Sequence, residues 1–317
     1  MNILVTGGAG YVGSVLVPEL LRNSHSVVVI DTFWFGDNLE DHQNLRKIKG
    51  DIRELKGSDL PELDAVIHLA AVANDPSVDL DPVLSWEIGA LGTLNLCNVA
   101  REKGVKTFIL ASSGSVYGIN DEPKVTEDLP LVPLSVYNKV KMIKERIVQS
   151  FSSEFRVVIF RPATICGWSP RLRLDLAVNA LTFSALQKKK ISVFGGDQMR
   201  PQLHIIDMVR AYTWALDNEK LKGVYNIGFE NDSIIDIAKK VQSSIDSEIE
   251  VVPSNDPRSY RLDSSKLTEA GFAPEKNTYN AILDLKERYE QGTLTETDMN
   301  YNVNWMKSIL KDSAGLE

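Results

Sequence analysis

Apolar residues in the first half of the chain come in short runs, separated by longer segments in which they recur every three or four positions. Short runs rich in Val, Ile and Leu are typical of strands buried on both faces, and the longer spacing is typical of helices. The runs predict strands over 2–6, 26–30, 46–50, 64–70, 106–111 and 155–160. The segments between them predict helices over 11–23, 81–103 and 135–152. This alternation predicts an α/β fold with a doubly wound parallel sheet, whose ligand crevice lies at the carboxyl ends of the strands.

After about Pro162 the regular alternation ends. The remaining pattern predicts helices near 175–188, 206–217, 233–245 and 278–291, separated by short strands and Gly/Pro turns. We therefore expect residues 1–162 to form the sheet domain, with chain crossings from later segments. Residues 163–317 are expected to form mainly a smaller, mixed α/β lobe.

Composition removes several classes of function. The 317 residues carry a net charge of −8, and a surface for nucleic acid needs clustered Lys and Arg. The two cysteines, Cys97 and Cys166, have no cysteine or histidine close to them in sequence, so neither a disulfide framework nor a metal site is expected. No apolar run approaches the length of a membrane span, and the chain opens on a strand rather than a signal peptide. These features predict a soluble, cytoplasmic protein that does not bind nucleic acid or membranes.

A glycine-rich turn follows the first predicted strand. Gly7, Gly10 and Gly13 stand three residues apart at the entrance to a helix. The first glycine permits a tight turn, the second lets the backbone approach a pyrophosphate, and the third lets the helix pack on the strand. The amino end of that helix offers N–H groups to phosphates, and Tyr11 and Val12 lie within this turn. The segment therefore predicts a dinucleotide site.

Asp31 indicates which dinucleotide is bound. It ends the second predicted strand, eighteen residues after Gly13, where a carboxylate can accept hydrogen bonds from both hydroxyls of a ribose. Its charge would repel the 2′-phosphate of NADP. We therefore expect NAD as the cofactor, bound by a Rossmann-type domain over 1–162, with the substrate held mainly by 163–317.

Candidate catalytic residues lie at two further positions along the sheet domain. Tyr137 and Lys141 are four residues apart on a predicted helix, so their side chains share one face. A nearby ammonium favours the phenolate form of tyrosine and so favours its use as a base. The strand over 106–111 leads into the serine-rich segment 112–118 at the same edge of the sheet. Together these features predict a site for proton and hydride transfer.

With these motifs in this order, the chain resembles the extended short-chain dehydrogenase/reductases, in particular the NAD-dependent epimerase/dehydratase family that acts on nucleotide sugars. The resemblance covers nearly the whole chain. It is carried by 6–13, 50–52, 67–71, 112–118, 137–141, 161–162, 200–207 and 256–266.

The resemblance implies roles for individual residues. Ser113 would hydrogen-bond the reacting sugar oxygen, Tyr137 would be the general base, and Lys141 would hold the nicotinamide ribose. Further cofactor contacts would come from Asp51, Ile52, Leu69, Ala70 and Ala71. Substrate contacts would come from Ser113, Ser115, Thr164, Arg200 and Arg258, the two arginines binding the diphosphate of a nucleotide sugar. Arg171 and Arg173 are second candidates for that diphosphate, and His68 is expected in the core. Trp168 is left between shielding the ligand and packing between the lobes.

Departures from the family pattern bear on the reaction. The resemblance places an Asp-Glu pair after the serine in dehydratases, and a Glu at the second position in decarboxylases, where this chain has Gly114 and Ser115. Epimerisation by transient oxidation and re-reduction is therefore the first expectation. A nucleotide-sugar ketoreductase or dehydrogenase is the alternative, and a non-catalytic NAD-sensing regulator is a third reading. Gly89 and Thr164 stand where the family often has Asn, which indicates either an unusual sugar or local repacking.

The resemblance also implies self-association. Family members commonly pair through two helices of each subunit, which correspond here to 81–103 and 135–152. The first of these segments is rich in leucine. A homodimer is therefore expected.

Overall fold

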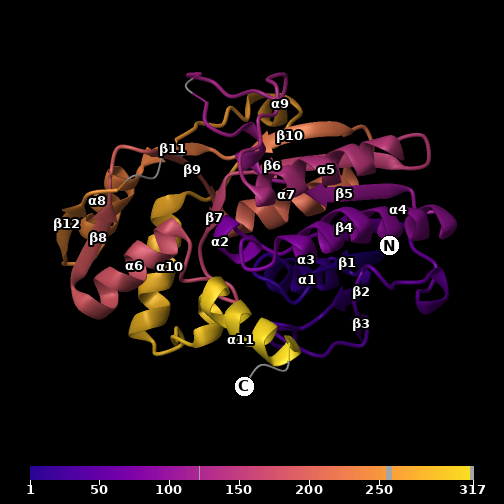
Figure 1. Cartoon of the computed structure of the whole chain (residues 1–317), viewed down its shortest axis with the longest axis horizontal. Helices are drawn as coiled ribbons and strands as arrows, with labels where there is room; N and C mark the ends of the chain where they lie inside the picture. The colour runs from indigo at the N-terminus through magenta and orange to yellow at the C-terminus, as the bar shows by residue number, and fades with distance from the viewer. Residues whose placement is uncertain (121, 255–258, 315–317) are drawn as a thin grey trace.

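The computed structural model describes residues 1–120, 122–254 and 259–314. Its centre is a parallel sheet of seven strands in the order β10-β6-β5-β4-β1-β2-β3 (Figure 1). These strands are β1 (Asn2–Thr6), β2 (Ser26–Asp31), β3 (Leu45–Lys49), β4 (Ala65–His68), β5 (Thr107–Ala111), β6 (Arg156–Pro162) and β10 (Gly223–Ile227). The doubly wound α/β sheet predicted from the apolar runs is thus confirmed. The six predicted strands differ from the observed ones by at most two residues at either end.

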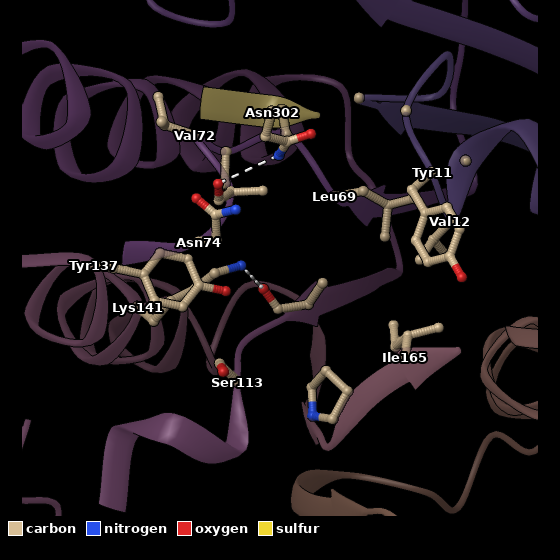
Figure 2. Close-up of a pocket in the computed structure, with 18 of the residues that line it drawn as sticks. Tyr11, Val12, Leu69, Val72, Asn74, Ser113, Tyr137, Lys141, Ile165 and Asn302 are labelled. Carbon is tan, nitrogen blue, oxygen red and sulfur yellow. Dashed lines mark hydrogen bonds between the residues drawn. The ribbon is translucent and has the colours of Figure 1, made fainter. Parts of the chain in front are cut away.

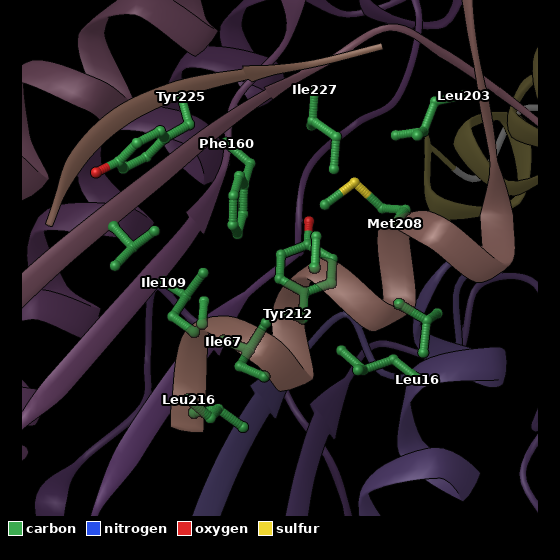
Figure 3. Packing of buried hydrophobic residues seen from close by; sticks show 14 of the residues in the cluster. Leu16, Ile67, Ile109, Phe160, Leu203, Met208, Tyr212, Leu216, Tyr225 and Ile227 are labelled. Carbon is green, nitrogen blue, oxygen red and sulfur yellow. The ribbon is translucent and has the colours of Figure 1, made fainter. Parts of the chain in front are cut away.

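Side chains alternate between the two faces within each buried strand, which is why the strands read as unbroken apolar runs. In β1, Ile3 and Val5 belong to one core cluster and Leu4 belongs to the other. The first cluster packs under α1 (Gly13–Arg22) and α7 (Ile205–Asp217), and the second packs under α4 (Gly92–Glu102) and α5 (Val136–Ser150). In Figure 3, Tyr212 of α7 lies against Ile67, Ile109 and Phe160 of the sheet.

The helical run predicted over 81–103 is interrupted. It consists of α3 (Pro82–Trp86), a π-helical turn (Glu87–Leu91) and α4. Gly89 lies in the π turn, and a Cβ built there would stand 2.1 Å from Cγ1 of Val140 in α5. The glycine therefore lets the π turn approach α5 closely.

The later half of the chain builds a smaller body around α6 (Ala177–Lys188), α8 (Ile234–Ser244) and α10 (Thr278–Glu290). It contains the parallel pair β8 (Lys190–Phe194) and β12 (Glu248–Val252). It also contains the sheet β11-β9-β7, formed by β7 (Thr164–Cys166), β9 (Met199–His204) and β11 (Glu230–Ser233). Two segments of this half return to the large sheet: β10 pairs with β6, and α7 covers one face.

Several short elements complete the fold. They are α2 (Asp75–Val78), α9 (Ser265–Glu269) and the 3₁₀ turns Gly57–Asp59, Gly114–Tyr117 and Asp298–Asn300. The C-terminal helix α11 (Asn302–Ala314) was not predicted from the sequence. It runs back toward the large sheet, near α2 (Figure 1), and Met306 enters the core cluster under α4 and α5. In the described part of the chain, no helix has the length and apolar character needed to span a bilayer.

Candidate active site

The glycine turn between β1 and α1 leaves no room for side chains at two of its three glycines. Gly7 has a φ of 72°, and a Cβ there would lie 2.7 Å from the backbone nitrogen of Ala70. A Cβ on Gly13 would lie 2.5 Å from the carbonyl oxygen of Gly7. The amide of Gly10 donates to that same carbonyl at 3.2 Å. The turn is therefore tight, and the amino end of α1 stands open toward the ends of the strands.

Asp31 ends β2 beside this turn. Its carboxylate accepts hydrogen bonds from the backbone amides of Ala9 at 3.0 Å and Phe33 at 2.8 Å. Burial raises the pKa of Asp31, and these two amides oppose that effect. A carboxylate fixed beside this tight glycine turn fits the adenosine ribose and pyrophosphate of NAD.

One cleft at the carboxyl ends of the strands brings together all the site residues predicted from the sequence that fall in the described part of the chain. Its lining includes Gly7, Gly10, Tyr11, Val12, Gly13, Asp31, Asp51, Ile52, Leu69, Ala70, Ala71, Ser113, Ser115, Tyr137, Lys141, Thr164 and Arg200. Figure 2 shows Tyr11 and Val12 across the cleft from Ser113, Tyr137 and Lys141. Arg258 lies outside the described residues.

Tyr137 and Lys141 project from one face of α5, which Ser135 caps by accepting a hydrogen bond from the Asn138 amide. Burial raises the pKa of Tyr137 to about 12, and a hydrogen bond with Ser113 opposes this effect. Burial lowers the pKa of Lys141 to about 8. The Lys141 ammonium donates to the carbonyl of Ala111 at 2.9 Å (Figure 2) and lies 5.7 Å from the centre of the Tyr137 ring. The phenol of Tyr137 and the ammonium of Lys141 therefore lie close together in the cleft, and burial changes the pKa of both.

A chain of polar contacts leads away from Ser113. The hydroxyls of Ser113 and Ser115 are 2.7 Å apart, and the Ser115 hydroxyl donates to Oδ1 of Asn138 at 2.6 Å. Asn138 thus fixes Ser115 beside the candidate hydroxyl of Ser113.

A side chain at position 114 would lie close to two neighbouring residues. A Cβ on this residue would lie 2.6 Å from Cδ1 of Leu262 and 3.2 Å from the carbonyl oxygen of Pro162. A side chain at this position would require the Leu262 side chain to move. The cleft has neither of the acids that follow the serine in dehydratases.

Beneath the serines lies a buried network that the sequence reasoning did not find. Glu145 of α5 forms an ion pair with Arg161, with hydrogen bonds of 2.7 and 3.0 Å, and accepts from Ser112. Arg161 also donates to the hydroxyl of Tyr117 at 2.7 Å. The available signal was spacing, because Glu145 stands four residues after Lys141 on the same helix face. The network ties the end of β5 to α5 and so positions the serine segment.

Two other buried groups border the cofactor side of the cleft. Lys144 has no exposed surface and donates to the carbonyl of Ala70 at 2.8 Å. Burial, followed by the charge of Lys141, holds the pKa of Lys144 well below its usual range. His68 lies in the core, as expected, between the hydroxyls of Thr6 at 2.7 Å and Thr93 at 3.0 Å.

The remaining candidates separate into two groups. Arg171 and Arg173 line the cleft, and Arg173 is paired with Asp175. Trp168 is not among the described residues that line the cleft, and its ring lies 3.7 Å beneath the guanidinium of Arg288. It also lines a second pocket together with Ser14, Val15 and Pro18 of α1, so Trp168 lies between the lobes, which is the second of its two expected roles. Throughout the described ranges, no group of three or more His, Cys, Asp or Glu side chains could hold a metal ion.

Comparison with known proteins agrees with this geometry. Residues 3–228 match the model of the NAD dependent epimerase/dehydratase family. A Bacillus subtilis protein described as an uncharacterized UDP-glucose epimerase, YtcB, is 36% identical over 76% of this chain and 81% of its own length. UDP-glucuronic acid decarboxylase 1 of Xenopus tropicalis is 28% identical over 78% of this chain and 61% of its own.

A solved structure resembles the fold closely. UDP-glucose 4-epimerase of Thermus thermophilus, crystallised in complex with NAD, superposes with a TM-score of 0.82 and 25% identity. The match covers 93% of this chain and 100% of that one. The segment matched by the family model includes the glycine turn, Asp31 and the Tyr137–Lys141 pair. The chain is therefore an NAD-dependent enzyme of the extended short-chain dehydrogenase/reductase type and belongs to the NAD-dependent epimerase/dehydratase family.

Proposed function

We propose that this enzyme epimerises a nucleotide sugar by oxidising and then re-reducing one carbon of the sugar. NAD, when bound, supplies the acceptor and then the donor of the hydride. The protein's part is to bind both molecules and to move one proton at the reacting oxygen.

Residues at the strand ends would bind the cofactor, and each would contact a different part of it. The glycine turn and the amino end of α1 would receive the pyrophosphate, and Asp31 would accept from the adenosine ribose. Asp51 and Ile52 would border the adenine. The channel toward the nicotinamide would be lined by Leu69, Ala70 and Ala71. Lys141 would turn from the Ala111 carbonyl to the nicotinamide ribose.

Proton transfer falls to Tyr137 and Ser113. The phenolate of Tyr137 would take the proton of the sugar hydroxyl as the hydride leaves its carbon, and return it in the second half of the reaction. Ser113 would hydrogen-bond the same oxygen, with its orientation set by Ser115 and Asn138. The ammonium of Lys141 and the positive charge of the oxidised cofactor both favour the phenolate, because opposite charge lowers a pKa.

The observation that carries the proposal is that Gly114 and Ser115 follow Ser113 in the cleft. Elimination of water needs a second acid–base group, and neither of these two residues can supply one. Ser115 occupies the position at which decarboxylases carry Glu, and its hydroxyl is engaged by Asn138. Hydride transfer with one tyrosine base is the chemistry that needs no further group.

The substrate proposal follows from charge and from the relatives. Arg200 lines the cleft from β9, and together with Arg258 it would bind the diphosphate of a nucleotide sugar, since guanidinium groups match phosphate oxygens well. Thr164 and Ser115 would contact the sugar. Several similar proteins carry UDP-sugars in their names, so UDP-sugars are the first to test. We also propose that the enzyme is a homodimer.

The test is an assay of purified enzyme with no added cofactor. UDP-glucose, UDP-galactose, their N-acetylhexosamine counterparts and UDP-glucuronic acid would each be followed by NMR. In an epimerase the cofactor is restored in every cycle, so we expect two epimers to approach equilibrium with no net change in nicotinamide absorbance. Stoichiometric formation of NADH or NAD⁺ with a keto or alcohol product would instead support a dehydrogenase or ketoreductase. Release of carbon dioxide from UDP-glucuronic acid would identify a decarboxylase, and no turnover with bound NAD would favour a regulator.

A further inference from the structure

Arg171 is a buried cation placed beside the glycine turn. It follows β7 in the chain, and its backbone amide contacts the Ser14 hydroxyl of α1 at 3.4 Å. Its side chain is 5% exposed and lies 3.9 Å over the ring of Phe35, four residues after Asp31. Stacking on an aromatic ring restricts the orientation of a guanidinium, so the side chain of Arg171 points in a fixed direction.

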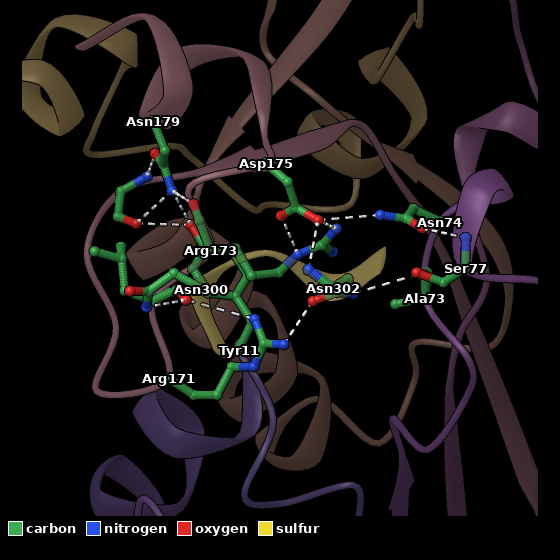
Figure 4. Close-up of polar contacts among 12 residues, drawn as sticks. Tyr11, Ala73, Asn74, Ser77, Arg171, Arg173, Asp175, Asn179, Asn300 and Asn302 are labelled. Carbon is green, nitrogen blue, oxygen red and sulfur yellow. Dashed lines mark hydrogen bonds and ion pairs between the residues drawn. The ribbon is translucent and has the colours of Figure 1, made fainter. Parts of the chain in front are cut away.

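The contacts of Arg171 do not neutralise its charge. Nη2 donates to Oδ1 of Asn302 at 2.5 Å, and Nη1 reaches the carbonyl of Leu172 at 3.5 Å. Both acceptors are neutral, and in the described part of the chain no carboxylate lies within ion-pair distance of Arg171. Its neighbour Arg173 differs, because it forms a two-pronged ion pair with Asp175 at 2.9 and 3.0 Å (Figure 4). Burial, followed by the charge of Arg173, lowers the pKa of Arg171 to about 9, so it remains cationic at neutral pH.

A buried cation without an ionic partner in the protein is costly, and a bound anion would offset that cost. The position of Arg171 in the cleft indicates which anion it would bind. Arg171 lines the same cleft as Gly10, Tyr11 and Val12, and its backbone amide contacts α1, whose amino end would receive phosphate groups. Figure 4 shows the Arg171 guanidinium joined to Asn302 by a hydrogen bond.

We propose that Arg171, which the smaller lobe supplies, binds the pyrophosphate of the cofactor rather than that of the nucleotide sugar. The guanidinium lies over the ring of Phe35, four residues after Asp31, and it lines the same cleft as that carboxylate, which is proposed for the adenosine ribose. The pyrophosphate of NAD adjoins that ribose. The residues proposed for the sugar nucleotide come from other elements, Arg200 from β9 and Thr164 from the start of β7.

The C-terminal segment holds Arg171 in this position. Besides accepting from Arg171, Asn302 donates from its backbone to Asp175 at 3.2 Å and from Nδ2 to the carbonyl of Ala73 at 3.4 Å (Figure 2). Three residues on, the Trp305 indole donates to the carbonyl of Trp34 at 2.5 Å. This segment therefore joins the smaller lobe to the loops around the cofactor cleft, and Asn302 is a positioning residue for Arg171.

The experiment measures binding rather than turnover. Cofactor-free Arg171→Gln and wild-type protein would be titrated by calorimetry with NAD, with ADP-ribose, with adenosine, and with UDP. Loss of a charge-assisted contact should weaken NAD and ADP-ribose about 10- to 100-fold. Adenosine, which lacks the diphosphate, and UDP should change less than about twofold on the same reasoning. Arg171→Lys should recover part of the loss, and Asn302→Ala should weaken NAD by about tenfold or less while leaving adenosine unchanged.

Arg288→Gln is the matched control, because Arg288 also stacks on an aromatic ring of the smaller lobe but lies outside the cofactor cleft. Its affinity for NAD should equal that of wild type. An equal loss of adenosine and NAD binding in Arg171→Gln, or a loss of UDP binding alone, would overturn the proposal. If Arg171→Gln does not fold, the same comparison with Arg171→Lys and Asn302→Ala decides. The inference rests on NAD as cofactor and not on epimerisation, so a failed epimerase assay leaves this result intact.

Discussion

Burial disfavours the phenolate form of Tyr137, which is the base that the proposed reaction needs. The Tyr137 hydroxyl is enclosed, which raises its pKa to about 12, and the Lys141 ammonium is directed at Ala111 rather than at the phenol. A phenolate at neutral pH therefore depends on charge brought by the cofactor and on the Ser113 hydrogen bond. We therefore expect the phenolate of Tyr137 to form only after NAD has bound.

Replacing Tyr137 by Phe tests this assignment. Removing the hydroxyl should lower kcat by about 100- to 10,000-fold, the usual range for a lost general base, while NAD stays bound. Kinetics on the active sugar nucleotide, with cofactor content determined after denaturation, would measure both. Tyr279→Phe is the control, because Tyr279 is exposed on α10 and should leave kcat unchanged. Near-full activity of Tyr137→Phe would remove this tyrosine from the mechanism.

Lys141 should destabilise the cofactor-free fold in a pH-dependent way. Its pKa is about 8 in the folded chain against an ordinary 10.5. Below pH 8 both the folded and unfolded states are protonated, and the full penalty, on the order of 3 kcal/mol, is present. Between pH 8 and 10.5 only the unfolded state keeps the proton, so the free energy of unfolding rises with pH and the penalty disappears.

Lys141→Met should therefore unfold with about 2 kcal/mol more free energy than wild type at pH 7, after the lost Ala111 contact is subtracted. The advantage should vanish near pH 10.5. Urea denaturation of both proteins across this pH range gives the comparison. Lys139→Met, an exposed lysine on the same helix, should show neither effect. A difference that does not depend on pH would contradict the assignment of the penalty to the buried charge.

At the scale of elements, the π turn at Glu87–Leu91 depends on the missing side chain of Gly89. Alanine at this position would gain helix propensity of about 1 kcal/mol, but its Cβ would collide with Val140. Overpacking of this kind costs about 1–3 kcal/mol, so we expect Gly89→Ala to lower the free energy of unfolding. Val140→Ala removes the colliding methyl groups, and the double variant should recover most of the loss. If the two effects are additive in this double-mutant cycle, the side chains at positions 89 and 140 do not collide.

The elements that the sequence predicted well are those whose pattern depends on the sheet itself. A strand such as β1 is apolar throughout because both faces are covered, and the glycine turn after it has a spacing that few other structures need. The 3₁₀ turns, the π turn and α11 were missed, because short or partly covered elements leave little periodic signal. The interruption at Gly89 could not be foreseen, since it depends on Val140, which is distant in sequence.

The candidate site also contains some residues that the sequence predicted and others that it did not. Gly7, Asp31, Tyr137 and Lys141 stand at spacings set by one strand–turn–helix unit or one helix face, so the sequence reveals them. The Glu145–Arg161 pair and the Arg171–Asn302 contact join residues whose proximity arises from the fold alone. Asn302 lies more than a hundred residues from Arg171, and nothing in its local sequence marks it.

At the scale of the whole molecule, one face of the sheet domain carries exposed leucines. Leu91 and Leu94, in the helical run over 82–102, are 61% and 42% exposed, and Val83 in the same run is 67% exposed. Their neighbour Leu96 is fully buried under the sheet, so this run has apolar surface left over after it has covered the core. Exposed apolar residues gathered on one helical run are typical of an interface between subunits.

We expect a second copy of the chain to cover this face, with the run over 82–102 and α5 of each subunit packing against those of the other about a twofold axis. Because such an interface uses the same patch twice, one substitution places two charges in it. Leu91→Asp combined with Leu94→Asp should therefore convert a dimer into a monomer at micromolar concentration, as measured by light scattering, while circular dichroism stays unchanged. Leu283→Asp is the control, because Leu283 is 39% exposed on α10 of the smaller lobe and should leave the mass at twice that of the chain. A wild-type protein that scatters as a monomer would remove the expectation altogether, and a dimer that survives both aspartates would place the contact on another face.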